Sequence, residues 1–325
     1  MDKDTYFDQG YEYVSGARIK SWKKGGHGLQ TFREVLQNSS NPGFVEIGRR
    51  LGKKRIYNYV KKFGLTQKTG VDLPGESCGI MFDYKNFHEL EQATVAFGQG
   101  ISVTPLQLVS AISACVNGGY LLQPHILKEV RNNNNEIIYQ AKRKVKRQVI
   151  KEETAKKVRD ALESVVTDGG GRNAYIDGYR IGGKTGTAQK AVNGSYVGGG
   201  YILSFVGIAP IDDPQIVLYI AMDNPKNCIQ YGGTTVAPIA RKMLLDILPA
   251  LNVKKVKSQR QKSYSIMDKR TIKVENYIGK KRSEVQNISL RITFVGKGNK
   301  VIDQLPRKGE YVEEGDTIVI MLGEK

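Results

Sequence analysis

Three strand-like runs in the second half of the chain constrain the fold most. They cover Tyr179 to Gln189, Tyr201 to Ala209 and Gln215 to Met222, and a helix pattern from Val236 to Leu248 follows them. The last two runs are separated only by Pro210 to Pro214, a composition typical of a tight turn. A strand meander that ends in a helix, with further helices earlier in the chain, predicts an α+β domain in which helices pack on an antiparallel sheet.

Further elements are predicted from periodicity and from start and stop residues. Apolar residues recur at helical spacing between Lys151 and Thr167. Thr104 and Pro105 fit the N-cap and first turn of a helix that ends at Asn117. We also expect helices at Leu29 to Asn38 and Lys53 to Phe63 with an interruption at Ser39 to Pro42, and a hairpin of Ile126 to Arg131 and Glu136 to Gln140 around the tip Asn132 to Asn135.

The length of 325 residues exceeds one average domain, and a change of composition indicates where the chain divides. Residues 252–269 are basic and polar without periodicity, which is typical of a linker. We therefore predict a large domain at 1–250, a basic linker at 251–269 and a small α/β domain at 270–325. In the small domain we expect strands at Thr271 to Val274, Arg291 to Val295, Val301 to Gln304 and Thr317 to Leu322, and a short helix near Lys280 to Asn287.

The formal net charge of +18 raises the question of a polyanionic partner. The basic runs Lys142 to Arg147 and Lys254 to Lys262 have no interleaved aromatic residues and match no nucleic-acid motif. We therefore expect no nucleic acid as a partner, and a basic surface that faces anionic wall or membrane polymers. No N-terminal signal peptide and no apolar run long enough to span a membrane is recognisable in the chain.

Cysteine and histidine positions point to no metal and no cofactor. The three cysteines and three histidines are scattered without ligand spacing, and no disulfide framework follows from them. Cys115 lies in an apolar helix pattern, where we interpret it as a buried hydrophobic residue.

The triplet Lys-Thr-Gly occurs twice, and its surroundings distinguish the two copies. Lys68-Thr69-Gly70 follows a helix and leads into Val71 to Glu76, which has the composition of a loop. Lys184-Thr185-Gly186-Thr187 follows strand-like residues and the pair Gly182-Gly183, whose small size we expect to let a substrate backbone lie alongside. We therefore predict that the second triplet is the functional one.

In serine acyl-transfer sites, Ser-x-x-Lys, Ser-x-Asn and Lys-Thr-Gly elements converge. The first supplies a nucleophile with an amine to take its proton, and the third presents a cation and a strand N–H that stabilises an oxyanion. Ser39-Ser40-Asn41 fits the second element, which offers a hydroxyl and a carboxamide. Alone it is a weak match, but together with Lys184 to Thr187 at this separation it becomes strong.

With these motifs the chain resembles class B penicillin-binding proteins over about residues 5 to 250, and it is most similar to the sporulation-type, cortex-synthesising members. The tail resembles a PASTA module, although it lacks the usual proline near Val274. The resemblance rests on Trp22-Lys23, Gly26-His27-Gly28, Gln37 to Pro42, Lys68 to Glu76, Phe97 to Gly100, Thr104-Pro105, Gly182 to Gln189 and Tyr231 to Pro238, and in the tail on Ile278-Gly279, Val295 to Gly298, Val301, Gln304, Pro306, Gly309 and Gly315.

The resemblance implies a penicillin-binding, β-lactamase-like fold and serine-type D,D-transpeptidase chemistry on peptidoglycan stem peptides, with β-lactams as mimics of the acyl donor. It implies that Ser39 and Asn41 relay protons and hold the substrate amide. Lys184 and Thr185, with Gly186, would recognise the substrate carboxylate, and the Thr187 N–H would help to form the oxyanion hole. It further implies contact with other cell-wall synthesis proteins, and a place on the extracytoplasmic face of a bacterial membrane, held there by an upstream anchor.

The resemblance also places the attacking serine of a Ser-x-x-Lys element upstream of Gly26 to Gly28. One formal match, Ser21 to Lys24, falls where the family has a strand-like segment, so we interpret it as coincidence. We therefore expect the nucleophile, its lysine and the membrane anchor to be missing from this chain. Three alternatives stay open: a fragment that is inactive alone, a split enzyme completed by an upstream polypeptide, and a non-catalytic module that binds peptidoglycan or a partner.

Overall fold

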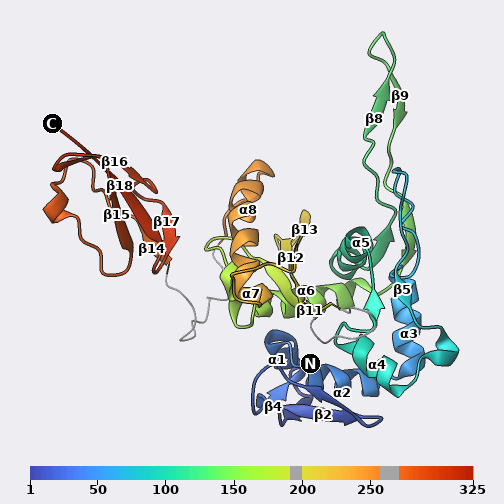
Figure 1. The fold of residues 1–325 in the computed structure, drawn as a ribbon. Helices are drawn as coiled ribbons and strands as arrows, with labels where there is room; N and C mark the ends of the chain where they lie inside the picture. The colour runs from blue at the N-terminus through green and yellow to red at the C-terminus, as the bar shows by residue number, and fades with distance from the viewer. Residues whose placement is uncertain (191–199, 257–270, 325) are drawn as a thin grey trace. The chain divides into compact units, whose positions relative to one another are not determined.

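The computed structural model describes residues 1–190, 200–256 and 271–324, which form two compact units (Figure 1). The first unit contains the described residues up to 256, and the second contains residues 271–324. Residues 257–269 of the predicted linker lie outside the described residues. In the described part of the chain, every helix is too short or too polar to cross a lipid bilayer.

A three-stranded antiparallel sheet forms the centre of the first unit. Strands β11 (Gly182–Gln189), β12 (Tyr201–Ala209) and β13 (Ile216–Asp223) lie in that order, with Lys184 opposite Val206. The predicted meander is therefore present, and β11 lies at one edge of the sheet.

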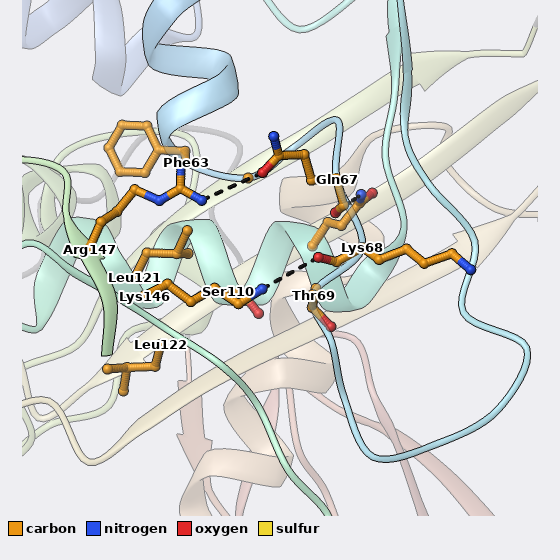
Figure 2. A pocket seen from close by; sticks show the side chains of 11 residues that line it. Phe63, Gln67, Lys68, Thr69, Ser110, Leu121, Leu122, Lys146 and Arg147 are labelled. Atoms are coloured by element: carbon orange, nitrogen blue, oxygen red, sulfur yellow. Dashed lines mark hydrogen bonds between the residues drawn. The ribbon is translucent and has the colours of Figure 1, made fainter. Parts of the chain in front are cut away.

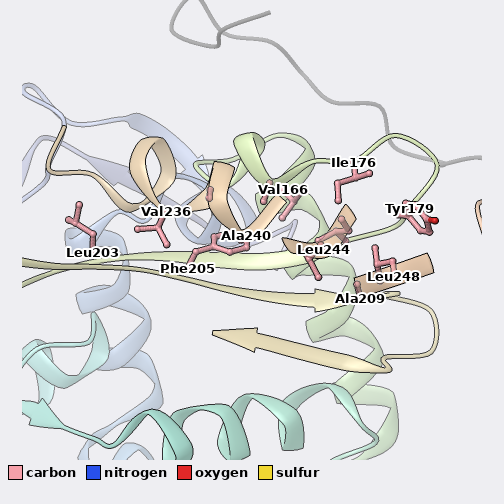
Figure 3. Packing of buried hydrophobic residues seen from close by; sticks show 13 residues of the cluster. Val166, Ile176, Tyr179, Leu203, Phe205, Ala209, Val236, Ala240, Leu244 and Leu248 are labelled. Carbon is pink, nitrogen blue, oxygen red and sulfur yellow. The ribbon is translucent and has the colours of Figure 1, made fainter. Parts of the chain in front are cut away.

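Helices cover both faces of this sheet, because β12 carries apolar side chains on both. Leu203, Phe205 and Ala209 point to one face and pack against Leu244 and other residues of α8 (Ala237–Ala250), as Figure 3 shows. Ile208 points to the other face. There it packs with Val116 of α5 (Pro105–Val116) and Leu162 of α6 (Glu152–Thr167). The predicted α+β fold class is confirmed.

The N-terminal segment begins with two strand pairs. Strand β1 (Thr5–Asp8) pairs with β4 (Gly28–Thr31), and β2 (Tyr11–Val14) pairs with β3 (Ala17–Lys20). The expectation that a helix begins at Leu29 was wrong, since residues 28–31 belong to β4.

Helix α1 (Phe32–Asn38) begins only after this strand, where Thr31 is its N-cap and Glu34 completes a capping box. A second helix, α2 (Asn41–Leu51), was missed in the sequence. Pro42 lies in its first turn, where it starts a helix rather than interrupting one.

A long two-stranded ribbon leaves the body of the first unit. Strand β7 (Tyr120–Leu122) pairs with β10 (Val145–Gln148) at its base, and β8 (Glu129–Arg131) pairs with β9 (Ile137–Gln140) beyond it. Figure 1 shows β8 and β9 extending away from the helices. The predicted hairpin and its asparagine tip are therefore present. The remaining elements of the unit are α3 (Lys53–Lys62), β5 (Ile80–Met81), η1 (Tyr84–Asn86), α4 (Glu89–Ala96), β6 (Ile101–Ser102), η2 (Arg172–Ala174) and α7 (Gly232–Thr235).

The second unit has its own apolar core around Tyr277, Ile318 and Ile320. In its larger sheet, β18 lies between its parallel neighbour β15 and its antiparallel neighbour β16. The expected helix near Lys280 is only the short 3-10 turn η3 (Arg282–Glu284), and strand β17 was not expected. Strand bounds are β14 (Thr271–Lys273), β15 (Arg291–Val295), β16 (Lys300–Leu305), β17 (Tyr311–Glu313) and β18 (Thr317–Gly323).

Candidate active site

Lys184 on β11 meets Ser39, which lies 145 residues earlier in the chain. The Lys184 ammonium donates to Ser39 Oγ at 2.8 Å and to the Thr185 carbonyl at 3.0 Å. Ser39 caps the C-terminus of α1 in the left-handed conformation, with φ of 54°. Two motifs that were predicted to act together are therefore brought into direct contact.

Ser40, the middle residue of the motif Ser39-Ser40-Asn41, fixes the junction of helices α1 and α2. Ser40 is fully buried and is the N-cap of α2, accepting from the Gly43 N–H at 3.1 Å. Its hydroxyl donates to the buried carboxylate of Asp8 at 2.8 Å. Asp8 also accepts from Ser21 Oγ at 3.2 Å and from the Gly10 N–H at 2.8 Å. Asp8 thus ties strand β1 to the turn that presents Ser39.

Asn41 is the first residue of α2 and is half-buried. Its Nδ2 donates to the Lys20 carbonyl at 3.1 Å, at the end of β3. The structure therefore places Asn41 beside Ser39 in the chain but holds its carboxamide nitrogen on the backbone of β3, and only Ser39 of the two contacts Lys184.

Thr185 and Thr187 lie two residues apart on β11, so their side chains point to the same face of the sheet. Thr185 is buried and Thr187 is exposed, with Thr187 Oγ1 accepting from the Gly232 N–H at 3.2 Å. A Cβ on Gly232 would lie 2.5 Å from the Gly186 carbonyl oxygen, so only glycine lets α7 approach the strand this closely. The segment from Tyr231 to Gly233 therefore packs directly against the strand that carries the predicted functional triplet.

The glycine pair before the triplet has a packing role that was not predicted from the sequence. A Cβ on Gly182 would lie 2.5 Å from Ile211 Cδ1, and one on Gly183 would lie 2.4 Å from Phe205 Cζ. Both glycines are buried, and core side chains occupy the space that a larger side chain would need at either position. Their absent side chains serve the packing of the sheet.

Burial lowers the pKa of Lys184 to about 8. Lys184 as a whole is half-buried, and its ammonium is the enclosed end of the side chain, against Ser39 and Thr185. Among the described residues, no carboxylate forms an ion pair with it and none raises its pKa. An enclosed cation that lacks a counter-charge is suited to bind an anionic group of a ligand.

Three aromatic side chains beside the junction were not assigned a role from the sequence. Trp22 Nε1 donates to the Asn38 carbonyl at 2.7 Å, one residue before Ser39. Its ring lies 5.2 Å from that of His27 and 5.5 Å from that of Tyr231. Burial lowers the pKa of His27 and raises that of Tyr231. Both belong to motifs that were recognised, but only the tertiary contact shows that they form one wall beside Ser39.

The first Lys-Thr-Gly triplet occupies a different place and already holds a carboxylate. Glu76 accepts from the Thr69 N–H at 2.6 Å and from the Gly70 N–H at 2.9 Å. Figure 2 shows Lys68 and Thr69 beside a small cavity that Lys146 helps to line. Neither Ser39 nor Lys184 lines that cavity, which is therefore not part of the Lys184 site.

The formal match at Ser21 is not on a helix. Ser21 follows β3, and its hydroxyl donates to Asp8.

Cys115 packs with Val116 and Ile112, and burial raises the pKa of its thiol to about 12, as suits a hydrophobic residue. Within residues 1–190, 200–256 and 271–324, no group of His, Cys, Asp and Glu could hold a metal ion.

The family model described as the penicillin-binding protein transpeptidase domain matches residues 1–245. The chain belongs to this transpeptidase family. Stage V sporulation protein D of Bacillus subtilis is 50% identical over 328 residues, covering 100% of this chain and 51% of that protein. The probable peptidoglycan D,D-transpeptidase PenA of Neisseria meningitidis is 32% identical over 69% of this chain and 37% of its own length. The chain thus spans about half or less of the length of these two transpeptidase relatives.

Solved transpeptidase structures share the fold. The apo transpeptidase domain of Burkholderia pseudomallei penicillin-binding protein 3 has a TM-score of 0.70 and 34% identity, covering 79% of this chain and 75% of that one. Penicillin-binding protein 3 of Mycobacterium tuberculosis in complex with ampicillin has a TM-score of 0.73 and 31% identity, covering 79% and 59%. The predicted family resemblance is confirmed, whereas the family match ends before the second unit, for which the PASTA assignment stays a prediction.

Proposed function

We propose that the first unit forms the substrate-recognition side of a serine D,D-transpeptidase site that acts on peptidoglycan stem peptides during synthesis of the spore cortex. The observation that carries the proposal is the 2.8 Å contact between Lys184 and Ser39, in a chain of the penicillin-binding transpeptidase family. The spore cortex is proposed because the relative with 50% identity is a stage V sporulation protein.

Each group near the contact has a chemical task in this proposal. Lys184 and Thr185 bind the terminal carboxylate of the stem peptide, because none of the described carboxylates pairs with the Lys184 cation. Ser39 passes a proton between Lys184 and the reacting groups, and Asn41 contacts the substrate amide after turning from the Lys20 carbonyl. The Thr187 N–H, on the edge strand of the sheet, donates to the developing oxyanion.

The acyl transfer proceeds in two steps, acylation of a serine and then aminolysis of the acyl-enzyme. A serine hydroxyl attacks the carbonyl carbon of the penultimate D-Ala, its proton passes to the leaving nitrogen, and the terminal D-Ala departs with that nitrogen. An amine of a second stem peptide then attacks the acyl-enzyme carbonyl, and the proton that this amine loses passes to the departing serine oxygen, which restores the hydroxyl. We assign the attacking serine to a Ser-x-x-Lys element outside residues 1–325, since Ser21 is held by Asp8 and Ser39 sits on a helix cap.

We expect the same site to bind β-lactams. Two of the solved structures of Mycobacterium tuberculosis penicillin-binding protein 3 are complexes, one with ampicillin and one with aztreonam. A β-lactam carries an anionic group beside a strained amide, so in this chain its anion would lie against Lys184 and Thr185. Attachment to the extracytoplasmic face of the membrane and contact with other cell-wall synthesis proteins belong to the same proposal.

The chain has a built-in reporter for this site, because its one tryptophan, Trp22, lies beside Ser39. We would titrate the chain with diacetyl-Lys-D-Ala-D-Ala and follow Trp22 fluorescence, with the C-terminal amide of the same peptide as the uncharged ligand. Lys184→Met should weaken binding of the acid about tenfold or more and leave the weaker binding of the amide unchanged.

Lys68→Met is the matched control, since it removes the lysine of the other triplet, which is exposed and lies elsewhere. The proposal fails if Lys68→Met and Lys184→Met weaken binding equally, or if the acid and the amide bind wild-type protein with the same affinity.

A further inference from the structure

The outer half of the β7–β10 ribbon exposes apolar side chains on both faces. Residues 126–144, the hairpin surface, comprise β8, β9 and the segments next to them. Ile126 is 67% exposed and Ile138 is 65% exposed. Ile138 is skipped in the strand pairing, because Val130 is opposite Tyr139 and Arg131 is opposite Ile137. Leu127, Val130, Ile137 and Tyr139 are also exposed.

The base of the ribbon is braced, so these side chains are held in a fixed place. Asp72 accepts from the N–H groups of Ile126 and Leu127 at 2.7 and 2.9 Å. The Gln123 carboxamide donates to the Gly70 carbonyl at 2.6 Å. Lys146 donates to the Lys68 carbonyl at 3.4 Å, a contact drawn in Figure 2. The loop of the first Lys-Thr-Gly triplet thus braces the base of the ribbon.

The hairpin surface is strongly basic. Its two carboxylates are engaged within the hairpin, Glu129 with Arg131 at 2.7 Å and Glu136 with the Asn132 side chain at 2.6 Å. Lys142, Arg143 and Lys144 are exposed, and in the described part of the chain none of the three forms an ion pair with a carboxylate. A partner for this surface therefore has to combine apolar contacts with negative charge.

A lipid bilayer fits this surface poorly. The tip carries four consecutive asparagines, Asn132 to Asn135, and Asn132 accepts from the backbone N–H groups of Asn134 and Asn135. Insertion deep enough to bury Ile137 and Ile138 would bury this polar tip as well. Among the described residues β8 and β9 pair only with each other, so their outer edges are open, and open sheet edges are not tolerated in hydrocarbon. A second copy fits no better, because two basic hairpins repel each other.

We propose that the hairpin surface docks a different protein, one that presents an apolar strip bordered by carboxylates and adds a strand to an open edge of the β8–β9 ribbon. Such a partner pairs the edge backbone groups, covers the apolar side chains and matches the charge. The polar tip stays in solvent in this arrangement.

Site-specific photo-crosslinking tests the proposal. Benzoylphenylalanine would replace Ile138 in the full chain in its native cells, with the same probe at Ile80 as the matched control, since Ile80 is 73% exposed on another part of the unit. A protein captured at 138 but not at 80 would be identified, purified and measured for direct binding. Ile138→Asp, and Lys142→Glu with Lys144→Glu, should each weaken that binding about tenfold or more.

Matched controls separate the hairpin from a general charge effect. Ile80→Asp, and Lys54→Glu with Arg55→Glu on α3, should change the affinity by less than about twofold. High salt should weaken the binding of wild type more than that of the double Lys variant. The proposal is overturned if no protein is captured above the Ile80 control, or if the hairpin variants bind the captured protein normally. It is also overturned if those variants instead lose binding to phosphatidylglycerol vesicles, which would identify a membrane surface.

Discussion

The Lys184 ammonium lies 2.8 Å from the Ser39 hydroxyl and joins the edge of the sheet to the junction of two helices. Neither side of this contact is free to move alone. Strand pairing with β12 fixes Lys184, and the buried Ser40–Asp8 hydrogen bond fixes the turn that carries Ser39. The two elements of the site are therefore pre-positioned before a ligand enters.

The pH dependence of ligand binding should follow Lys184. Its pKa is lowered from 10.5 to about 8, so carboxylate binding should weaken as the pH rises through 8 and Lys184 becomes neutral. Trp22 titrations between pH 6.5 and 9.5 measure this, and Lys184→Met should give a flat profile. A wild-type affinity that does not change over this range would contradict the assignment.

Stability should change in the opposite sense with pH. The unfolded chain holds the Lys184 proton more tightly than the folded one, so between pH 8 and 10.5 the contribution of Lys184 to the free energy of unfolding should rise with pH. Urea denaturation of wild type and Lys184→Met over this range measures the difference. The gap between them should be largest at or below pH 8, with Lys184→Met the more stable protein, and should narrow as the pH rises.

Asp8 should contribute to the stability of the fold, because it accepts the hydrogen bond of the buried Ser40 hydroxyl. Asp8→Ala would leave the buried Ser40 hydroxyl without its acceptor and should lower the free energy of unfolding by about 2–3 kcal/mol. Ser21→Ala removes only the longer bond and should cost about 1 kcal/mol or less. Urea denaturation measures both, and equal losses would show that Asp8 does not anchor the Ser40 turn.

The hydrogen bonds that Glu76 accepts from the Thr69 and Gly70 N–H groups should hold the loop of the first triplet in place. Glu76→Gln should make residues 67–77 more sensitive to limited proteolysis, because the carboxylate that gathers the Thr69 and Gly70 N–H groups is lost. Burial raises the pKa of Glu76, but the hydrogen bonds from Thr69 and Gly70 together outweigh it, and the net pKa is lowered. These contacts therefore stabilise the fold fully above the ordinary glutamate pKa, and their contribution is lost as the pH falls through the lowered value. Peptide affinity at the Lys184 site should stay unchanged, and a tenfold loss there would contradict the separation of the two triplets.

The sequence predicted the sheet and distinguished the two Lys-Thr-Gly triplets because both signals are local. That Lys184 to Thr187 is the functional triplet stays a prediction. Two nearly continuous apolar runs and the short turn between them define β12 and β13, and the surroundings of Lys184 distinguish it from Lys68. Helix α2 was missed because only Ser39 and Ser40 separate it from α1, and Pro42 was interpreted as a break rather than a start.

The features that the sequence did not predict depend on contacts between residues that are distant in the chain. Nothing near Gly183 in the chain indicates that Phe205 fills the space beside it, and nothing near Trp22 indicates that Tyr231 lies against its ring. The bond from Ser40 to Asp8 likewise joins residues that share no motif. Such residues become visible only when the strands and helices that carry them are packed together.

A crystal structure of the chain soaked with ampicillin tests the central claim most directly. The account predicts that the drug carboxylate lies within hydrogen-bond distance of Lys184 Nζ or Thr185 Oγ1, and that neither Ser39 nor Ser21 carries an acyl group. Ampicillin bound away from Lys184, or a covalent bond from the drug to Ser39, would contradict it.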